Sequence, residues 1–193
     1  MKPLSTKTQF KEALTYLKES RKYVYTVIIL FFLSVLFGFL FKENLTFIDK
    51  LLEQLIIQTQ NLNTIEMIFF ILQNNLLSSF ISIVTGIFIG AFPVASTIIN
   101  GTVLGYVLGL TLDTSSIASW WRLLPHGIFE LPAIFISFGI GIKLGFSLFL
   151  NKKIRVREFK RRFYNSFNVL LIVVIPLLII AAIIEGLLIS LLP

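Results

Sequence analysis

Residues 75–112 form one continuous stretch without a charged side chain. A helix needs about 20 apolar residues to cross a bilayer, so this stretch is too long for a single crossing. A soluble chain of 193 residues has no interior large enough to hide it, because the whole sequence is 56% hydrophobic and only 14% charged. Cysteine is absent, which excludes a disulfide scaffold. The sequence predicts an all-α, polytopic membrane protein with a single transmembrane domain over residues 1–193, and it argues against nucleic acid as a partner.

Five spans are predicted from the apolar runs. The long stretch needs a break, and we place it at Pro93 because proline lacks an N–H and clashes with the preceding turn. Asn100 followed by Gly101 is the alternative, since this dipeptide favours turns. The connection has no charge, so the two segments either cross twice or form a re-entrant hairpin. The predicted spans cover about residues 23–41, 75–92, 94–112, 125–150 and 167–192.

The basic residues predict the orientation of these spans in the cell membrane. Residues 1–22 contain six Lys or Arg, and residues 151–162 contain seven. Residues 42–66 have two Lys against four acids, and residues 113–124 have one Asp and one Arg. Short positive segments stay in the cytoplasm. The N-terminus is therefore predicted to be cytoplasmic and the C-terminus outside, and the basic segments also favour anionic lipid headgroups.

Two amphipathic surface helices are predicted beside the first span. Phe10, Leu14 and Leu17 recur at helical spacing among lysines, which is typical of a helix on a membrane surface. The second amphipathic helix is predicted to lie outside, and its apolar stripe consists of Phe47, Leu51, Leu52, Leu55 and Ile56.

Trp120 and Trp121 fit the outer aromatic belt.

Small residues recur every four positions in several spans. Such spacing marks close helix contacts, because lipid tails give no hydrophobic drive for helix association. The stripe on the third span favours packing within the chain, and a homodimer face is the alternative, so a homo-oligomer is left open. The small residues are Gly86 and Gly90, then Thr97, Gly101, Gly105 and Gly109, then Gly141 and Gly145.

A few polar side chains fall inside the predicted spans. Ionisable groups there are costly and mark functional sites by default. Glu130 and Glu185 are predicted roughly 6 and 10 Å below the outer surface, from the helical rise per residue. Lys143 lies near the inner end of its span and is predicted to snorkel to the interface. The predicted intramembrane polar site comprises His126, Glu130, Glu185, Asn100, Asn74 and Asn75.

Two prolines shape the segment that contains His126. Pro125 suits a first helical turn. Pro132 is predicted to interrupt the helix and to free the carbonyl of Ile128 near Glu130. An imidazole, a carboxylate and a free carbonyl in this arrangement bind a cation, relay a proton, or hold helices together by hydrogen bonds.

Catalysis is disfavoured by the motifs that the sequence lacks. There is no HExxH, GxSxG, P-loop or GxGxxG pattern. We therefore predict no enzyme, no catalytic residue and no cofactor. One histidine with two glutamates is a sufficient ligand set for zinc, so the metal is left open and an intramembrane hydrolase is a minor alternative.

The order of these motifs resembles the stage II sporulation protein M family of bacterial and archaeal integral membrane proteins. The resemblance runs from Asn74 and Asn75, through Asn100-Gly101 and Leu104-Gly105, to PHGIFELPA at residues 125–133 and then Glu185. The sporulation member of this family is a polytopic scaffold that recruits peptidoglycan-degrading partners to the septal membrane. The resemblance implies a non-enzymatic scaffold for membrane or envelope partner proteins, with the six polar residues above as its site. The alternative is a small transporter or channel with an outward-facing pocket for a cation or proton.

Overall fold

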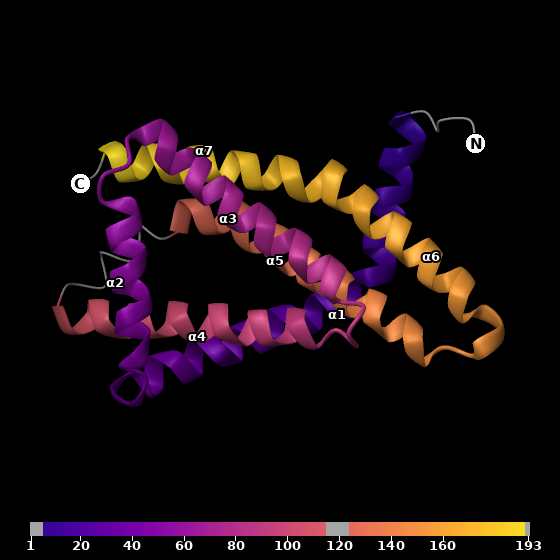
Figure 1. Ribbon diagram of the computed structural model, residues 1–193, viewed down its shortest axis with the longest axis horizontal. Coiled ribbons are helices and arrows are strands. Elements are labelled where there is room, and N and C mark those ends of the chain that lie inside the picture. Colours follow the sequence, from indigo (N-terminus) through magenta and orange to yellow (C-terminus); the bar gives the residue numbers. More distant parts are fainter. Residues whose placement is uncertain (1–5, 115–123, 192–193) are drawn as a thin grey trace.

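The computed structural model describes residues 6–114 and 124–191, with side chains from 7–112 and 127–188. All regular secondary structure in these residues is helical (Figure 1). Five of the described helical segments are long and apolar enough to cross a membrane, as the composition predicted. The helices are α1 (Thr6–Leu40), α2 (Phe47–Thr59), α3 (Thr64–Thr85), α4 (Ala91–Thr114), α5 (Leu124–Gly145), α6 (Lys152–Val169) and α7 (Ile175–Leu191).

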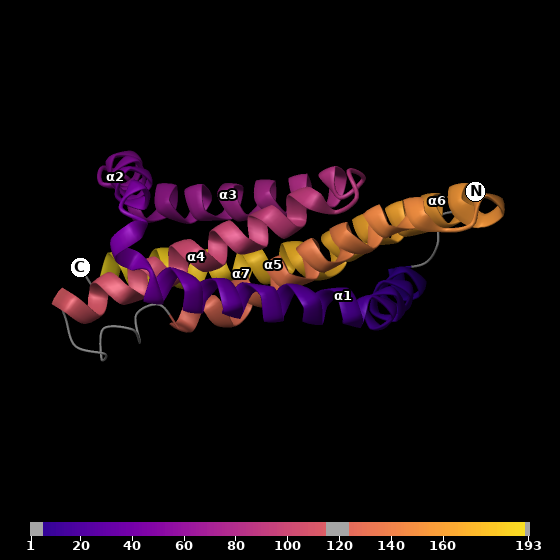
Figure 2. The same ribbon diagram turned by 90° about the horizontal axis from the view of Figure 1, so that it is seen from below.

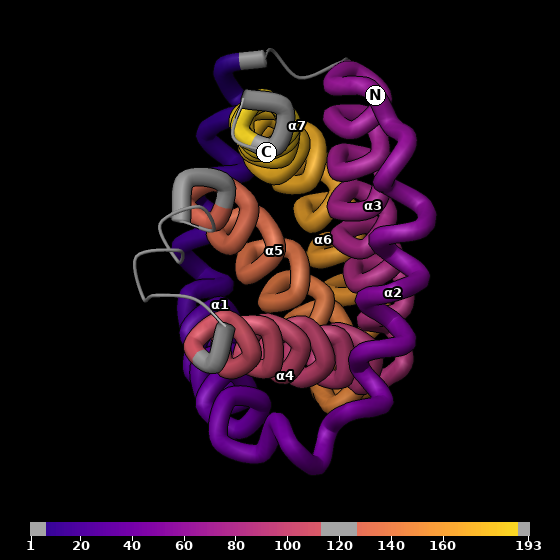
Figure 3. The backbone as a smooth tube through the Cα atoms, turned by 90° about the vertical axis from the view of Figure 1, so that its left-hand side faces the viewer, coloured from indigo at the N-terminus to yellow at the C-terminus, as the bar shows by residue number. Residues whose placement is uncertain are grey.

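Helix α5 lies at the centre of the bundle. It contacts α1, α3, α4 and α7, and Figure 3 shows it between them. Of the most apolar stretch of α5, 78% is buried, against 22–39% for the other four spans. A helix that is apolar or small on every side belongs inside a bundle. The residues of α5 are therefore the ones most able to meet groups from several other helices.

The turn between α3 and α4 lies at residues 86–90 rather than at Pro93. Ile89 and Gly90 have left-handed φ values of 60° and 72°, which redirect the chain just before α4 begins. Pro93 falls in the first turn of α4, where a missing N–H breaks no helical bond. The two helices therefore differ from the predicted spans 75–92 and 94–112, and each is 22 residues long in its apolar part. That length favours two crossings over a re-entrant hairpin.

The glycines of the charge-free turn pack against α5. A Cβ atom at Gly86 would collide with the backbone of Gly141, and one at Gly145 would collide with the backbone of Gly86 and Gly90. Only residues without side chains allow the two backbones to come this close. The protein thus buries the backbone at Gly86 and Gly90 of a turn that has no charged residue, while the side chains of Phe88 and Ile89 are exposed.

Helix α1 joins the predicted surface helix and the first predicted span in one element. No Gly or Pro interrupts residues 6–37, so nothing in the sequence ends the helix. Its N-terminal part turns across α6 (Figures 1 and 2). There Asn168 Nδ2 donates a hydrogen bond to Gln9 O at 2.9 Å, and the hydroxyls of Tyr16 and Ser166 lie 3.4 Å apart.

The second amphipathic helix is confirmed as α2. It crosses the end of the bundle at which α1 and α4 finish (Figure 1). The Tyr106 hydroxyl of α4 donates a hydrogen bond of 2.6 Å to Asp49 Oδ1 of α2. This bond attaches the surface helix to the spanning helices.

The small-residue stripe of α4 faces α1. Added Cβ atoms at Gly101, Gly105 and Gly109 would meet atoms of α1 or of Lys42 just after it. Helix α1 of the same chain therefore occupies this stripe, which is the intramolecular packing predicted for it.

Helices α6 and α7 are joined through a π-helical turn, Leu170–Val174. The Ile175 N–H donates to Leu170 O across this wider turn. Pro176 follows directly, and its ring would clash with the carbonyl of Ile172 in a regular α-helix. The wide turn accommodates the proline and lets the helical rod continue to Leu191.

Candidate intramembrane polar site

Three polar side chains meet where α3, α5 and α7 pack together. Asn75 of α3 is 8% exposed, and its side chain forms a hydrogen bond with the Glu130 carboxyl of α5. The Glu185 carboxyl of α7 is close enough to Glu130 for their charges to interact. Glu185 Oε2 is buried and has no hydrogen-bond partner among the described residues. Two carboxyl groups and one amide therefore converge inside the bundle.

Small residues allow the three helices to approach at this point. Ala133 of α5 and Ala181 and Ala182 of α7 are buried. Gly186 of α7 packs against Ile68 of α3, where any Cβ would collide with the isoleucine side chain. Close helix packing of this kind puts short polar side chains within reach of one another.

The buried face of α3 continues the polar character of the site. Asn75, Ser79 and Ser82 are spaced four and three residues apart, so they lie on one helix face, and all three are buried. The hydroxyls of Ser79 and Ser82 have no partner among the described residues.

The other predicted site residues do not join this group. Asn74 is exposed, because neighbouring residues on a helix point about 100° apart. Asn100 is also exposed, and its Nδ2 donates to Ser96 O at 2.7 Å on its own helix. His126 lies in α5, one turn before Glu130, but its side chain is outside the described residues, as are Trp120 and Trp121. Of the six predicted residues, the structure brings together Asn75, Glu130 and Glu185.

Pro132 is inside α5 rather than at a break. The helix continues for three further turns because neighbouring helices hold it, as happens with prolines in membrane helices. The proline ring is exposed, so it faces away from the packed side of α5.

The chemistry of the site follows from its burial. Two carboxylates close together in a medium of low dielectric repel each other strongly. The site is therefore suited to holding a proton or a cation between Glu130 and Glu185. Among the described side chains, no group of three His, Cys, Asp or Glu forms a metal cluster.

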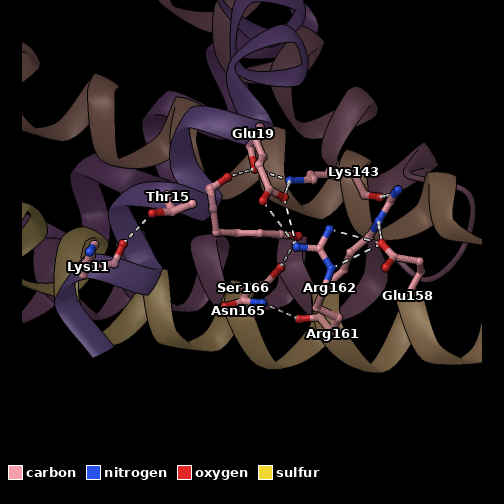
Figure 4. A network of polar contacts seen from close by, with 11 residues as sticks. Lys11, Thr15, Glu19, Lys143, Glu158, Arg161, Arg162, Asn165 and Ser166 are labelled. Carbon is pink, nitrogen blue, oxygen red and sulfur yellow. Dashed lines mark hydrogen bonds and ion pairs between the residues drawn. The ribbon is translucent and has the colours of Figure 1, made fainter. Parts of the chain in front are cut away.

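A second polar cluster, centred on Lys143, was missed by the sequence analysis (Figure 4). Lys143 does not snorkel to the interface, because its side chain is 5% exposed and turns toward α1. Its Nζ lies 3.3 Å from Glu19 Oε2, donates to Ser20 Oγ at 3.1 Å, and sits 3.7 Å from the ring centroid of Tyr16. The buried ammonium is thus stabilised by an ion pair, a hydrogen bond and an aromatic face. The sequence signal that could have revealed this cluster is Glu19, an acid that lies close before the first predicted span.

Helix α6 completes this cluster. Arg161 Nη1 lies 3.1 Å from Glu19 Oε2, and Arg161 Nη2 lies 3.1 Å from Glu158 Oε2. Arg162 Nη1 donates a 2.6 Å hydrogen bond to the Lys143 carbonyl near the end of α5. The cluster therefore connects the N-terminal part of α1, the end of α5 and the basic helix α6.

A bundle of five described helical segments that are long and apolar enough to cross a membrane defines an integral membrane protein. Residues 27–188 match the family of stage II sporulation protein M, and the chain belongs to this family. The match confirms the resemblance based on the motifs. It includes Asn75, Glu130 and Glu185 but begins after Glu19.

An archaeal relative is similar over nearly the whole chain. An uncharacterized protein of Methanocaldococcus jannaschii is 29% identical over 190 residues, which cover 91% of this chain and 85% of that protein. No solved structure gives a significant match.

Proposed function

We propose that the protein is a non-enzymatic membrane scaffold that holds partner proteins against its outer helices. The observation that carries this proposal is the hydrogen bond between the side chains of Asn75 and Glu130. The polar groups pair across α3 and α5 in a buried place, which stabilises a fixed arrangement of helices. Membership of the family of stage II sporulation protein M supports the same role.

The partner surface in this proposal is the exposed side of α1. Phe32, Leu36 and Phe37 are about half exposed and lie on one side of the helix. In a membrane, such a face contacts either lipid or the helix of another protein. Phenylalanine side chains bury a large area when they pack, which favours the contact with a partner helix.

Site-specific photocrosslinking in native membranes tests the scaffold. A photoreactive phenylalanine analogue at Phe37, which is 49% exposed, is expected to form a discrete protein adduct after illumination. The same analogue at Phe138, which is 0% exposed, is the matched control and should give none. Mass spectrometry of the adduct identifies the partner. Only lipid adducts from Phe32, Leu36 and Phe37 alike would contradict the scaffold.

A second function, proton or cation passage, is favoured by one separate observation. Glu185 Oε2 is buried beside Glu130 without a hydrogen-bond partner among the described residues. An oxygen in this position accepts a bond when a proton or cation enters the site.

Flux measurements in liposomes separate the two functions. If the second function holds, Glu130→Gln and Glu185→Gln each lower proton- or cation-driven flux at least ten-fold, because an amide neither releases a proton nor neutralises a cation. Glu53→Gln, at an exposed position on α2, is the control and should leave flux unchanged. Wild-type protein without flux across a panel of monovalent and divalent cations would leave the scaffold as the function.

A further inference from the structure

A groove of about 810 Å³ lies between α1 and α5, apart from the polar site. Apolar side chains make up most of its wall, among them Tyr25 and Ile28 from α1 and Phe135 from α5. Lys18 and Arg21 of α1 also line it. The groove therefore combines a long apolar wall with two cations on its α1 side.

The two cations have no acidic partner within the part of the chain that the structure describes. Lys18 and Arg21 are exposed, and neither takes part in an ion pair with another described residue. The nearby acid Glu19 is already paired with Lys143 and Arg161. A ligand with a negative charge thus finds two available donors here.

The order of residues along α1 separates charge from apolar surface. Lys18, Arg21, Tyr25 and Ile28 are spaced three or four apart, so they follow one face of the helix. The cations come first and the apolar residues follow toward the membrane interior. This is the arrangement of an amphiphile, with a charged head at the surface and chains below it.

We propose that this groove binds one anionic phospholipid of the leaflet at the N-terminal end of α1. The phosphate lies between Lys18 and Arg21, and an acyl chain lies along Ile28 and Phe135. Leu14 and Leu17 precede the two cations on α1 and line the groove on the headgroup side of the phosphate. The predicted topology puts this end at the cytoplasmic leaflet, where anionic lipids are attracted by basic segments.

A second groove supplies an internal comparison. It has a volume of about 560 Å³ and lies between α3 and the α6–α7 rod, with Phe80 and Leu171 in its wall. Gln73 is the one polar side chain in its lining, and the lining contains no Lys or Arg. A lipid chain fits this groove, but nothing in its lining selects an anionic headgroup.

Native mass spectrometry of the full chain tests the proposal. The protein in detergent is mixed with equal amounts of phosphatidylglycerol and phosphatidylcholine of identical chains, and retained lipids are counted. Wild type is expected to retain one phosphatidylglycerol in preference. The Lys18→Gln, Arg21→Gln double variant should lose this preference at least ten-fold, since each basic residue contributes to binding of an anionic headgroup. Lys152→Gln with Lys153→Gln, at exposed positions of α6, is the matched control and should keep it.

A pair of tryptophan variants tests where the lipid lies. Leu14→Trp narrows the groove between α1 and α5, and it should lower retention of both lipids at this site several-fold. Leu171→Trp makes the same change in the second groove and should leave the phosphatidylglycerol preference unaltered. Equal thermal unfolding of all variants in detergent shows that the fold is kept. An unchanged preference in the Lys18, Arg21 double variant, or an equal loss in the Lys152, Lys153 control, overturns the proposal.

Discussion

Replacing Gly105 by alanine is expected to lower the free energy of unfolding by about 3 kcal/mol. The added methyl group would collide with the backbone carbonyl of Val35 and crowd the backbone nitrogen of Phe39, both on α1. Backbone atoms cannot rotate away as a side chain does, so α1 and α4 must separate. Denaturant titration of the purified protein in detergent measures the loss.

Gly127→Ala is the matched control for this change. Among the described residues, a Cβ at Gly127 meets only the flexible side chain of Leu131, at an ordinary distance of 3.6 Å. Alanine also favours helix over glycine by up to about 1 kcal/mol. The control is thus expected to be neutral or stabilising, and equal losses for Gly105→Ala and Gly127→Ala would show that the α1–α4 contact is not tight.

Reversing the charge of Lys143 is the second change with a large expected effect. Lys143→Glu puts a carboxylate beside Glu19 and removes the cation from the Tyr16 ring. Breaking a buried ion pair costs about 3–5 kcal/mol, and we expect the lower end because the Glu19 side chain is 41% exposed. The same denaturant titration measures this loss.

The charge swap Glu19→Lys with Lys143→Glu tests the mechanism of that loss. If the ion pair is responsible, the double variant regains part of the stability, and a double-mutant cycle gives the coupling energy. Lys152→Glu is the control at an exposed position. Failure of the swap to recover any stability would assign the effect to packing around Lys143 instead.

The fold was largely predictable from the sequence, because long charge-free runs are stable only as helices that cross a membrane. The position of the turn between α3 and α4 was not. Pro93 was the strongest local signal, yet a proline is harmless in the first turn of a helix. The chain turns earlier, where Gly86 and Gly90 fit against Gly141 and Gly145 of α5. That fit is a tertiary contact, which local patterns do not contain.

The polar site was partly predictable for a similar reason. Apolar surroundings singled out Glu130 and Glu185, but nothing local distinguishes Asn75 from Asn74, since which of two neighbours faces the bundle depends on helix rotation. For Asn100, the sequence did contain a signal that its side chain points away from the helix contact. Gly101 and Gly105 face α1, so the residue just before Gly101 points about 100° away from that contact. Lys143 was misjudged because snorkelling is the usual behaviour of lysine near a membrane surface.

The π-helical turn at residues 170–174 determines which side of α7 each later residue occupies. A regular α-helix rotates about 100° per residue, and a wide turn of this kind inserts about one extra residue. Without that insertion, Glu185 would rotate about the axis of α7 by roughly this angle and lose its alignment with Glu130. The alignment of the two carboxyl groups thus depends on a helical insertion that ends at Val174, eleven residues before Glu185, and contains no polar side chain.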